Sequence, residues 1–254
     1  MENIEKILND LESKHAIRII YAVESGSRAW GMASKDSDFD IRFIYVHRSL
    51  TTYLSLSPAA VPKTIDGFSE DRLYDWQGWE LSKTLGHLRD TNPSIVEWLY
   101  SPIIYRDTSD PMNLAGWSKA LIEGERRTAA LMQHYHSMAK KNYFSYIDGK
   151  SQVNVKKYMN VIRPVAMLEW LLKVNNPTGP LIQIDCAALF EEIKEFIGDE
   201  LYGSIMYLSK RKQNMQEGDS QDRIASVDDW IRTAISNEMS ELIKTKFAGQ
   251  AEKT

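Results

Sequence analysis

The sequence predicts an α+β protein, with a small mixed-sheet domain over residues 1–110 and a helical domain over residues 111–254. Short apolar runs broken by Gly, Pro, Ser and Asp fill the chain up to about residue 105, whereas apolar residues at helical spacing dominate from about residue 113. The length of 254 residues fits one large or two compact domains. A composition with 43% hydrophobic and 26% charged residues excludes a mostly disordered chain.

The elements of the first part follow from local patterns. Apolar residues at helical spacing predict a helix over residues 2–13, and a β-branched and aromatic run predicts a strand over residues 16–23. Similar runs and stripes predict further strands over 39–46, 73–76 and 102–105, a short helical turn over 28–32, and helices over 79–89 and 95–100, separated by Asn92-Pro93.

The second part reads as a series of helices joined by polar segments. A spacing of 3.6 residues between apolar positions predicts helices over 114–140, 155–174, 187–196, 201–212 and 227–246. The segment Asn175-Asn-Pro-Thr-Gly-Pro180 predicts a loop between two of these helices, and the chain contains no internal repeat.

Charge and cysteine content narrow the class of protein. The formal charge of -4 excludes a strongly basic protein but leaves room for a local basic face. The single cysteine, Cys186, cannot form an internal disulfide and lies in an apolar stretch, so we expect a buried thiol and a reducing, cytoplasmic location. The sequence shows no signal peptide and no apolar run of membrane length, so we expect no membrane partner. It leaves the oligomeric state open.

The segment Asp36-Ser-Asp-Phe-Asp-Ile-Arg-Phe43 carries the strongest chemical signal. Residues two apart share a face of a strand, so Asp38, Asp40 and Arg42 would point one way and the apolar residues between them the other. Two neighbouring carboxylates repel each other unless a cation binds them, and Mg²⁺ (or Mn²⁺) suits such oxygen ligands. The alternative is a solvated acidic strand end.

The upstream segment favours the metal site. Gly26-Ser27 follows a predicted strand, where glycine lets a phosphate approach the backbone and exposed N–H groups bind anions. A phosphate cradle beside a carboxylate pair indicates phosphoryl transfer assisted by two metal ions.

These residues also carry a resemblance. Gly26-Ser27, a ten-residue spacer and Asp38-Phe-Asp40 resemble the signature of the DNA polymerase β nucleotidyltransferase superfamily. The longer string Gly26-Ser-Arg-Ala-Trp-Gly31 resembles one branch more closely, the YcgL-like or RNA repair pathway polymerase β family. The resemblance extends to residues 75–83, 92–99 and 101–105, to Lys156-Lys-Tyr158 and to Arg163-Pro164, and so covers about residues 15–175.

The resemblance implies roles for individual positions. Gly26 and Ser27 would hold a nucleoside triphosphate such as ATP, and Asp38 and Asp40 would bind the metals. A third carboxylate on a neighbouring strand is expected at Asp75, with Glu80 as a weaker candidate because it would lie in the following helix. Arg28, Arg42 and Lys157 are further candidates for contacts with the phosphates. Arg28 and Arg42 could each equally form a surface ion pair.

Other motifs fail on spacing. An EF-hand starting at Asp36 would need glycine where Ile41 stands and glutamate where His47 stands. Gly149-Lys-Ser151 resembles the end of a P-loop, but Phe144 occupies the position of its first glycine. A metal-dependent glycosyltransferase would use the Asp-x-Asp pair yet leaves Gly26-Ser27 unexplained.

The function that this pattern implies is transfer of a nucleoside monophosphate from an NTP to a hydroxyl, with release of pyrophosphate. Basic pairs interleaved with tyrosines in the second part, such as Lys140-Lys141 and Lys156-Lys157, leave open an RNA acceptor or a set of solvated helix faces. The rival hypothesis is a non-catalytic regulator that binds nucleotide or a partner protein, such as a toxin–antitoxin component.

Overall fold

The computed structural model is an α+β protein, as the sequence predicts. Its contacts group the chain into two compact units, one made of Met1–Ala29 with Ser37–Gly124, the other of Trp30–Asp36 with Glu125–Thr254. The structure describes residues 2–54, 61–108, 113–125, 127–174, 179–214 and 219–247. Within these residues no helix is both long and apolar enough to cross a membrane.

A five-stranded mixed sheet forms the first unit. Its strand order is β3-β4-β2-β1-β5, in which β2 and β4 run parallel and the other neighbours are antiparallel. The strands are β1 (Ile17–Glu24), β2 (Phe39–His47), β3 (Thr64–Phe68), β4 (Tyr74–Glu80) and β5 (Ile104–Asp107).

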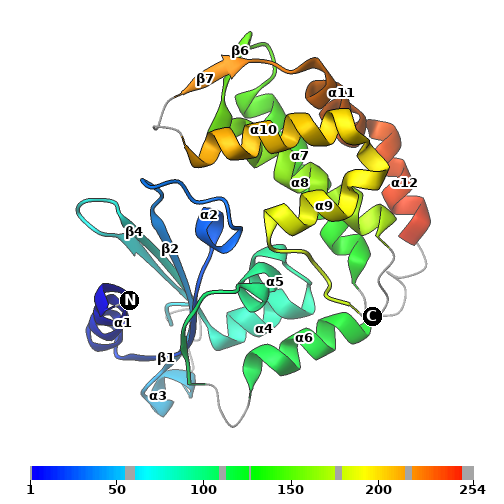
Figure 1. Ribbon diagram of the computed structural model, residues 1–254. Helices are drawn as coiled ribbons and strands as arrows, with labels where there is room; N and C mark the ends of the chain where they lie inside the picture. Colours follow the sequence, from blue (N-terminus) through cyan, green and yellow to red (C-terminus); the bar gives the residue numbers. More distant parts are fainter. Residues whose placement is uncertain are drawn as a thin grey trace. The chain divides into compact units, whose positions relative to one another are not determined.

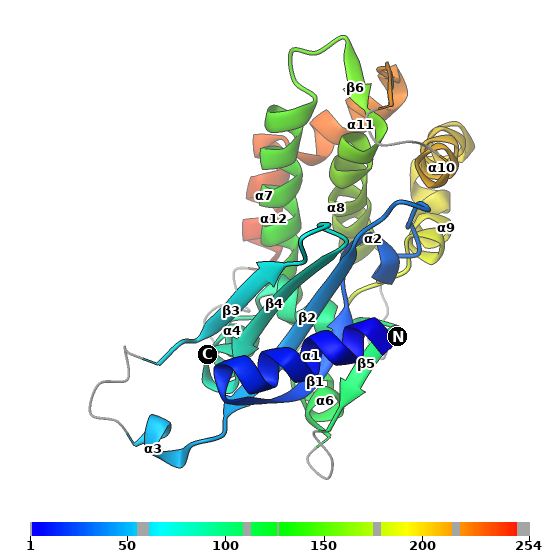
Figure 2. The same ribbon diagram turned by 90° about the vertical axis from the view of Figure 1, so that its left-hand side faces the viewer.

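Helix α1 (Glu2–His15) covers one face of this sheet, as Figure 2 shows. Its apolar stripe of Ile4, Leu8 and Leu11 belongs to one buried cluster with Ile41 and Phe43 of β2. The alternation along β2 is therefore as predicted, with the apolar side chains between the aspartates facing a helix. Burial of this face fixes the register of β2 and places Asp40 and Arg42 on the other face.

The other face of the sheet packs against α4 (Leu81–Arg89) and α5 (Pro93–Tyr100). Trp79 of β4 contacts Trp98 of α5 with ring centroids 4.2 Å apart and His87 of α4 at 4.6 Å. The remaining helices of this unit are α2 (Gly26–Ala29), α3 (Leu50–Tyr53) and α6 (Leu114–Glu125).

The second unit is helical, and Figure 1 shows its helices in green to red. Its central pair is α7 and α8, whose buried side chains include Tyr135 and Tyr158. The helices are α7 (Thr128–Tyr146), α8 (Val155–Lys173), α9 (Cys186–Ile197), α10 (Asp199–Gln213), α11 (Ala225–Ala234) and α12 (Asn237–Phe247). The short strands β6 (Gln152–Asn154) and β7 (Ser220–Asp222), which are far apart in the sequence, pair as a two-stranded antiparallel sheet.

Residues 30–36, which link α2 to β2, pack within this second unit. The guanidinium of Arg163 lies 3.9 Å from the centroid of the Trp30 ring, and Lys212 Nζ donates to the Met32 carbonyl at 2.6 Å. The Cys186 N–H donates to the Trp30 carbonyl at 3.0 Å. The segment between the Gly-Ser and Asp-x-Asp residues is thus held by α8, α9 and α10.

Several expected elements differ from the observed ones. The helix expected over 114–140 is two helices, and the one expected over 227–246 divides at Ile235-Ser236. Strand β3 and the β6–β7 pair were not expected, and the strand expected over 73–76 extends to Glu80. Helix α6 groups with the first unit by its contacts, and the domain boundary at residue 110 stays a prediction.

Candidate active site

Asp40 and Asp75 lie side by side on adjacent strands. The parallel register pairs Asp40 of β2 directly with Asp75 of β4, and paired strands are about 4.8 Å apart. The residues that follow them, Ile41 and Trp76, pack on the α1 side of the sheet. Because successive side chains alternate, both carboxylates point to the opposite face, where a single ligand can reach both.

Gly26 lies directly against the carboxylate of Asp40. Its φ of +61° lies in the left-handed region, and a Cβ built on it would stand 2.0 Å from Asp40 Oδ2. The neighbouring Ser25 N–H donates to the Asp40 carbonyl at 2.8 Å. Both the conformation and the close approach require glycine here. The Gly-Ser turn and the second aspartate of Asp-x-Asp are therefore in contact.

Arg42 bridges the two carboxylates. One terminal nitrogen lies 2.8 Å from Asp40 Oδ1, and the other lies 2.6 Å from Asp75 Oδ1. Only 18% of the Arg42 side chain is exposed, against 45% for Asp75. Of the two roles considered for Arg42, the structure contains the ion pair, but its partners are the expected site residues themselves.

Arg28 holds the start of β2 through backbone contacts. Its Nε donates to the Asp38 carbonyl at 3.0 Å and a terminal nitrogen donates to the Ser37 carbonyl at 2.7 Å. The guanidinium also stacks 3.7 Å from the centroid of the Phe39 ring. These contacts tie α2, which contains Ser27, to the strand with the aspartates. A phosphate contact by Arg28 stays a prediction.

The pair of Asp40 and Asp75 fits a divalent cation. Carboxylate oxygens are hard ligands of the kind that Mg²⁺ prefers, and the guanidinium of Arg42 stands in as their cation in this structure. Among the described residues no three His, Cys, Asp or Glu side chains are grouped as a metal site. The structure thus joins two of the three expected carboxylates, and Asp38 remains a proposed ligand.

Glu80 does not lie beside the aspartates. It is the last residue of β4, five positions beyond Asp75, and pairs with Tyr45 rather than with Asp40. Its carboxylate caps α4 by accepting from the Ser82 N–H at 2.7 Å, and it is 2% exposed. The expectation that Glu80 lies one turn into a helix is wrong because β4 continues through it, and its capping role favours Asp75 as the third carboxylate.

Glu24 is a carboxylate of this region that the sequence analysis did not single out. It ends β1, is fully buried, and accepts from the Asp40 N–H at 2.7 Å and from the Tyr105 hydroxyl. Burial raises the pKa of this carboxyl, against the lowering effect of the two hydrogen bonds. An acidic residue directly after an apolar strand and before Ser25-Gly26 was the available signal.

The two basic candidate residues of the second unit, Lys157 and Arg163, each lie against an aromatic ring of the same unit. Lys157 lies in the first turn of α8, with its Nζ 4.6 Å from the centroid of the Tyr146 ring. Arg163 is 3% exposed, so it packs under Trp30 rather than forming part of a solvent-facing basic surface. Trp30 therefore packs residues 30–36 against α8.

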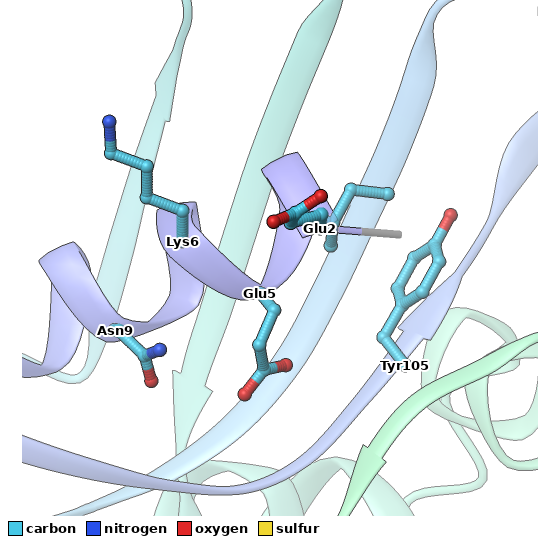
Figure 3. Close-up of a pocket in the computed structure, with 6 residues that line it drawn as sticks. Glu2, Glu5, Lys6, Asn9 and Tyr105 are labelled. Atoms are coloured by element: carbon cyan, nitrogen blue, oxygen red, sulfur yellow. The ribbon is translucent and has the colours of Figure 1, made fainter.

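An open pocket of ≈ 520 Å³ lies elsewhere in the first unit, as Figure 3 shows. It is lined by Glu2, Ile4, Glu5, Lys6 and Asn9 of α1 and by Tyr105 of β5. Because α1 covers the Ile41 face, this pocket is on the opposite side of the sheet from the carboxylate pair. It contains none of the expected site residues.

Comparisons with known proteins bear on this site. A family model described as the RNA repair pathway DNA polymerase beta family matches residues 1–251. Uncharacterized protein YcgL of Bacillus subtilis (strain 168) is 35% identical over 232 residues, which are 91% of this chain and 84% of that protein. A crystal structure of a nucleotidyltransferase-like protein from Exiguobacterium sibiricum 255-15 aligns with 98% of this chain and 77% of its own, at 14% identity and a TM-score of 0.31.

Proposed function

The chain belongs to the RNA repair pathway DNA polymerase beta family, and we propose that it is a metal-dependent nucleotidyltransferase. It transfers a nucleoside monophosphate from an NTP to a hydroxyl acceptor and releases pyrophosphate. The observation that carries the proposal is the contact of the Gly26 turn with Asp40, which pairs in register with Asp75. It supports the proposal because the turn that would bind phosphate contacts one of the two carboxylates that would bind the metal.

Each site residue has a defined part in this reaction. The Gly26-Ser27 turn binds the triphosphate through its backbone N–H groups and the Ser27 hydroxyl, because the missing Cβ lets phosphate approach. Asp38, Asp40 and Asp75 hold Mg²⁺ or Mn²⁺, which when bound supplies positive charge against the phosphate oxygens. Arg28 and Arg42 are the proposed cationic contacts of the phosphates, and a phosphate contact by Lys157 stays a prediction.

The covalent step is an in-line displacement. The acceptor oxygen forms a bond to the α-phosphorus as the bond from that phosphorus to the pyrophosphate oxygen breaks, and the pyrophosphate leaves with the bonding electrons. Asp75, with 45% of its side chain exposed, is the carboxylate open enough to receive the proton of the acceptor hydroxyl.

An RNA 3′ end is the proposed acceptor, with a protein side chain or a small molecule as the alternatives. The support for RNA is the family description together with the basic pairs of the second unit, such as Lys156-Lys157. The proposed setting is the cytoplasm, where NTPs and RNA are both present.

The test is incubation of the full chain with each of the four α-labelled NTPs, Mg²⁺ or Mn²⁺, and tRNA or total RNA. Wild type is expected to transfer label, and the double variant Asp38→Ala, Asp40→Ala is expected to lose transfer. The matched control is Asp66→Ala, which removes an exposed aspartate from β3 and leaves transfer intact. Transfer that survives the double substitution, or absence of label on every acceptor with wild type, contradicts the proposal.

A second candidate is a nucleotide- or partner-binding regulator, because Arg42 already supplies a positive charge to the carboxylate pair. Binding of a partner protein without any affinity for the metal-nucleotide complex would favour the regulator. Calorimetry with Mg²⁺ and NTP separates the two, since the enzyme binds NTP in a metal-dependent way.

A further inference from the structure

The guanidinium of Arg42 occupies the oxygens that a metal ion would need. Its two terminal nitrogens contact Oδ1 of Asp40 at 2.8 Å and Oδ1 of Asp75 at 2.6 Å, and one of them also donates to the Ile41 carbonyl at 3.1 Å. The contacted side chains are only partly exposed, 23% for Asp40 and 45% for Asp75. The planar guanidinium spans two carboxylates with separate nitrogens, which the single charged group of lysine does less well.

Electrostatics require that this arrangement change when a metal binds. Two adjacent carboxylates need a cation, and Arg42 supplies one positive charge from the same strand. A divalent ion that takes the same oxygens brings two charges and repels the guanidinium at contact distance. Arg42 must then turn away, and it loses both ion pairs unless another anion replaces them.

A triphosphate is the anion that the proposed reaction delivers to this place. Its oxygens enter next to Asp40, because the Gly26 turn that is proposed to hold them contacts that side chain. Guanidinium groups bind both carboxylate and phosphate through bidentate hydrogen bonds. The phosphate oxygens therefore become new anionic partners of the Arg42 guanidinium when a metal ion binds the carboxylates.

We propose that Arg42 is an internal counter-cation that competes with the metal for Asp40 and Asp75 and passes to the triphosphate when nucleotide binds. This inference rests on the proposed function. It makes metal binding weak without nucleotide and couples the two ligands, because each one favours the state in which Arg42 has left the carboxylates. By linkage, the nucleotide raises metal affinity by the same factor as the metal raises nucleotide affinity.

The experiment measures Mn²⁺ binding to the full chain by electron paramagnetic resonance, first alone and then with α,β-methylene-ATP, which resists transfer. Arg42→Gln removes the competing charge. It is expected to bind Mn²⁺ alone about tenfold more tightly than wild type, because the interaction of one partly exposed charge changes affinity by about this factor. In the same variant, the gain in Mn²⁺ affinity from the nucleotide falls by about the same factor.

Two variants serve as controls. Arg42→Lys keeps the charge and is expected to retain weak binding of Mn²⁺ alone. Arg48→Gln removes an equal charge from a side chain that is 58% exposed and pairs with Glu12, and it leaves Mn²⁺ affinity unchanged. Arg42→Met keeps an unbranched, uncharged side chain that replaces the aliphatic part of arginine, and it is measured beside Arg42→Gln, so that one folded variant suffices.

The outcomes decide between the two proposals. Tighter Mn²⁺ binding by Arg42→Gln or Arg42→Met, but not by Arg48→Gln, supports competition even if no acceptor is labelled, in which case only the proposed function fails. Equal or weaker binding by the Arg42 variants overturns the competition, and so does an absence of Mn²⁺ binding in both wild type and variants. Transfer activity that persists alongside equal binding leaves the proposed function standing.

Discussion

Gly26 joins a backbone requirement to the chemistry of the site. Its φ of +61° is unfavourable for any other residue, and the Asp40 carboxylate fills the space where a side chain would begin. The sequence predicts a glycine-dependent phosphate turn here, but not that the turn contacts an aspartate. That contact depends on β1 and β2 pairing with Glu24 opposite Ile41.

Gly26→Ala is expected to abolish transfer because the new methyl displaces Asp40. It is also expected to lower the free energy of unfolding by about 1–3 kcal/mol, the cost of a left-handed alanine. Gly86→Ala is the matched control, since Gly86 is within α4 and a Cβ there meets nothing within 4 Å. We expect it to raise the free energy of unfolding by about 1 kcal/mol. Urea unfolding and the transfer assay measure both, and full activity in Gly26→Ala would contradict the proposed turn.

Cys186 is the buried thiol that the sequence predicts. It is 1% exposed at the start of α9, and burial raises the pKa of its thiol to about 11. At pH 8 the thiolate fraction is then about 1 in 1,000, against about a quarter for a free cysteine.

The folded protein is therefore expected to react with Ellman's reagent at pH 8 at least about 100-fold more slowly than the protein in guanidinium chloride. The rate in the folded state should rise as the pH is raised toward 11, because deprotonation supplies the nucleophile. Cys186→Ala gives the zero level of the assay. Rapid reaction of the folded thiol at pH 8 would contradict its burial.

At the scale of elements, the pairing of β2 with β4 brings the site together. The alternation of Phe39, Ile41 and Phe43 with polar residues predicts which face of β2 is buried, and the structure confirms it. The sequence does not predict that β4 pairs in parallel with β2, because strand pairing depends on long-range contacts. The sequence also predicts too short a strand for β4, because Gly78 interrupts the aromatic residues that mark a strand.

The helix boundaries of the second unit show where periodicity is least informative. Apolar spacing continues from α6 into α7 and from α11 into α12, so it cannot mark the breaks. Short polar strands such as β6 and β7, with one buried residue each, give no pattern to detect. The sequence offers Arg42 as a candidate but not its ion pairs with Asp40 and Asp75, and it does not single out Glu24, because these contacts depend on strand pairing.

Trp30 holds the segment between α2 and β2 within the second unit. Trp30→Ala removes the ring that Arg163 stacks on, and we expect the free energy of unfolding to fall by about 3 kcal/mol. Trp117→Ala is the matched control because this side chain is 73% exposed, and we expect a change within about 0.5 kcal/mol. Circular dichroism during urea unfolding compares them, and equal effects would contradict the packing role of Trp30.

At the scale of the whole molecule, the formal charge of -4 includes the acidic residues of the proposed metal site. Metal and NTP that bind only the folded state stabilise it by about 2.7 kcal/mol at a hundredfold excess over the Kd. For a chain of this size we expect a rise in Tm of about 5–10 °C. Differential scanning calorimetry should show this rise with Mg²⁺ and NTP together and lose it in Asp40→Asn. The same rise in the variant would place the ligands elsewhere.

The central claim is that Asp40 and Asp75 form the carboxylate pair of a nucleotidyl transfer site. The most direct measurement is the rate of label transfer from an α-labelled NTP to RNA in the presence of Mg²⁺ for wild type, Asp75→Asn and Glu80→Gln. We expect Asp75→Asn to reduce the rate by about 10²–10³-fold, as for loss of a group that stabilises transition-state charge. Glu80→Gln, which alters the cap of α4 and the hydrogen bond from the Tyr53 hydroxyl, should retain most of the rate. A wild-type rate in Asp75→Asn, or a large loss confined to Glu80→Gln, would contradict the account.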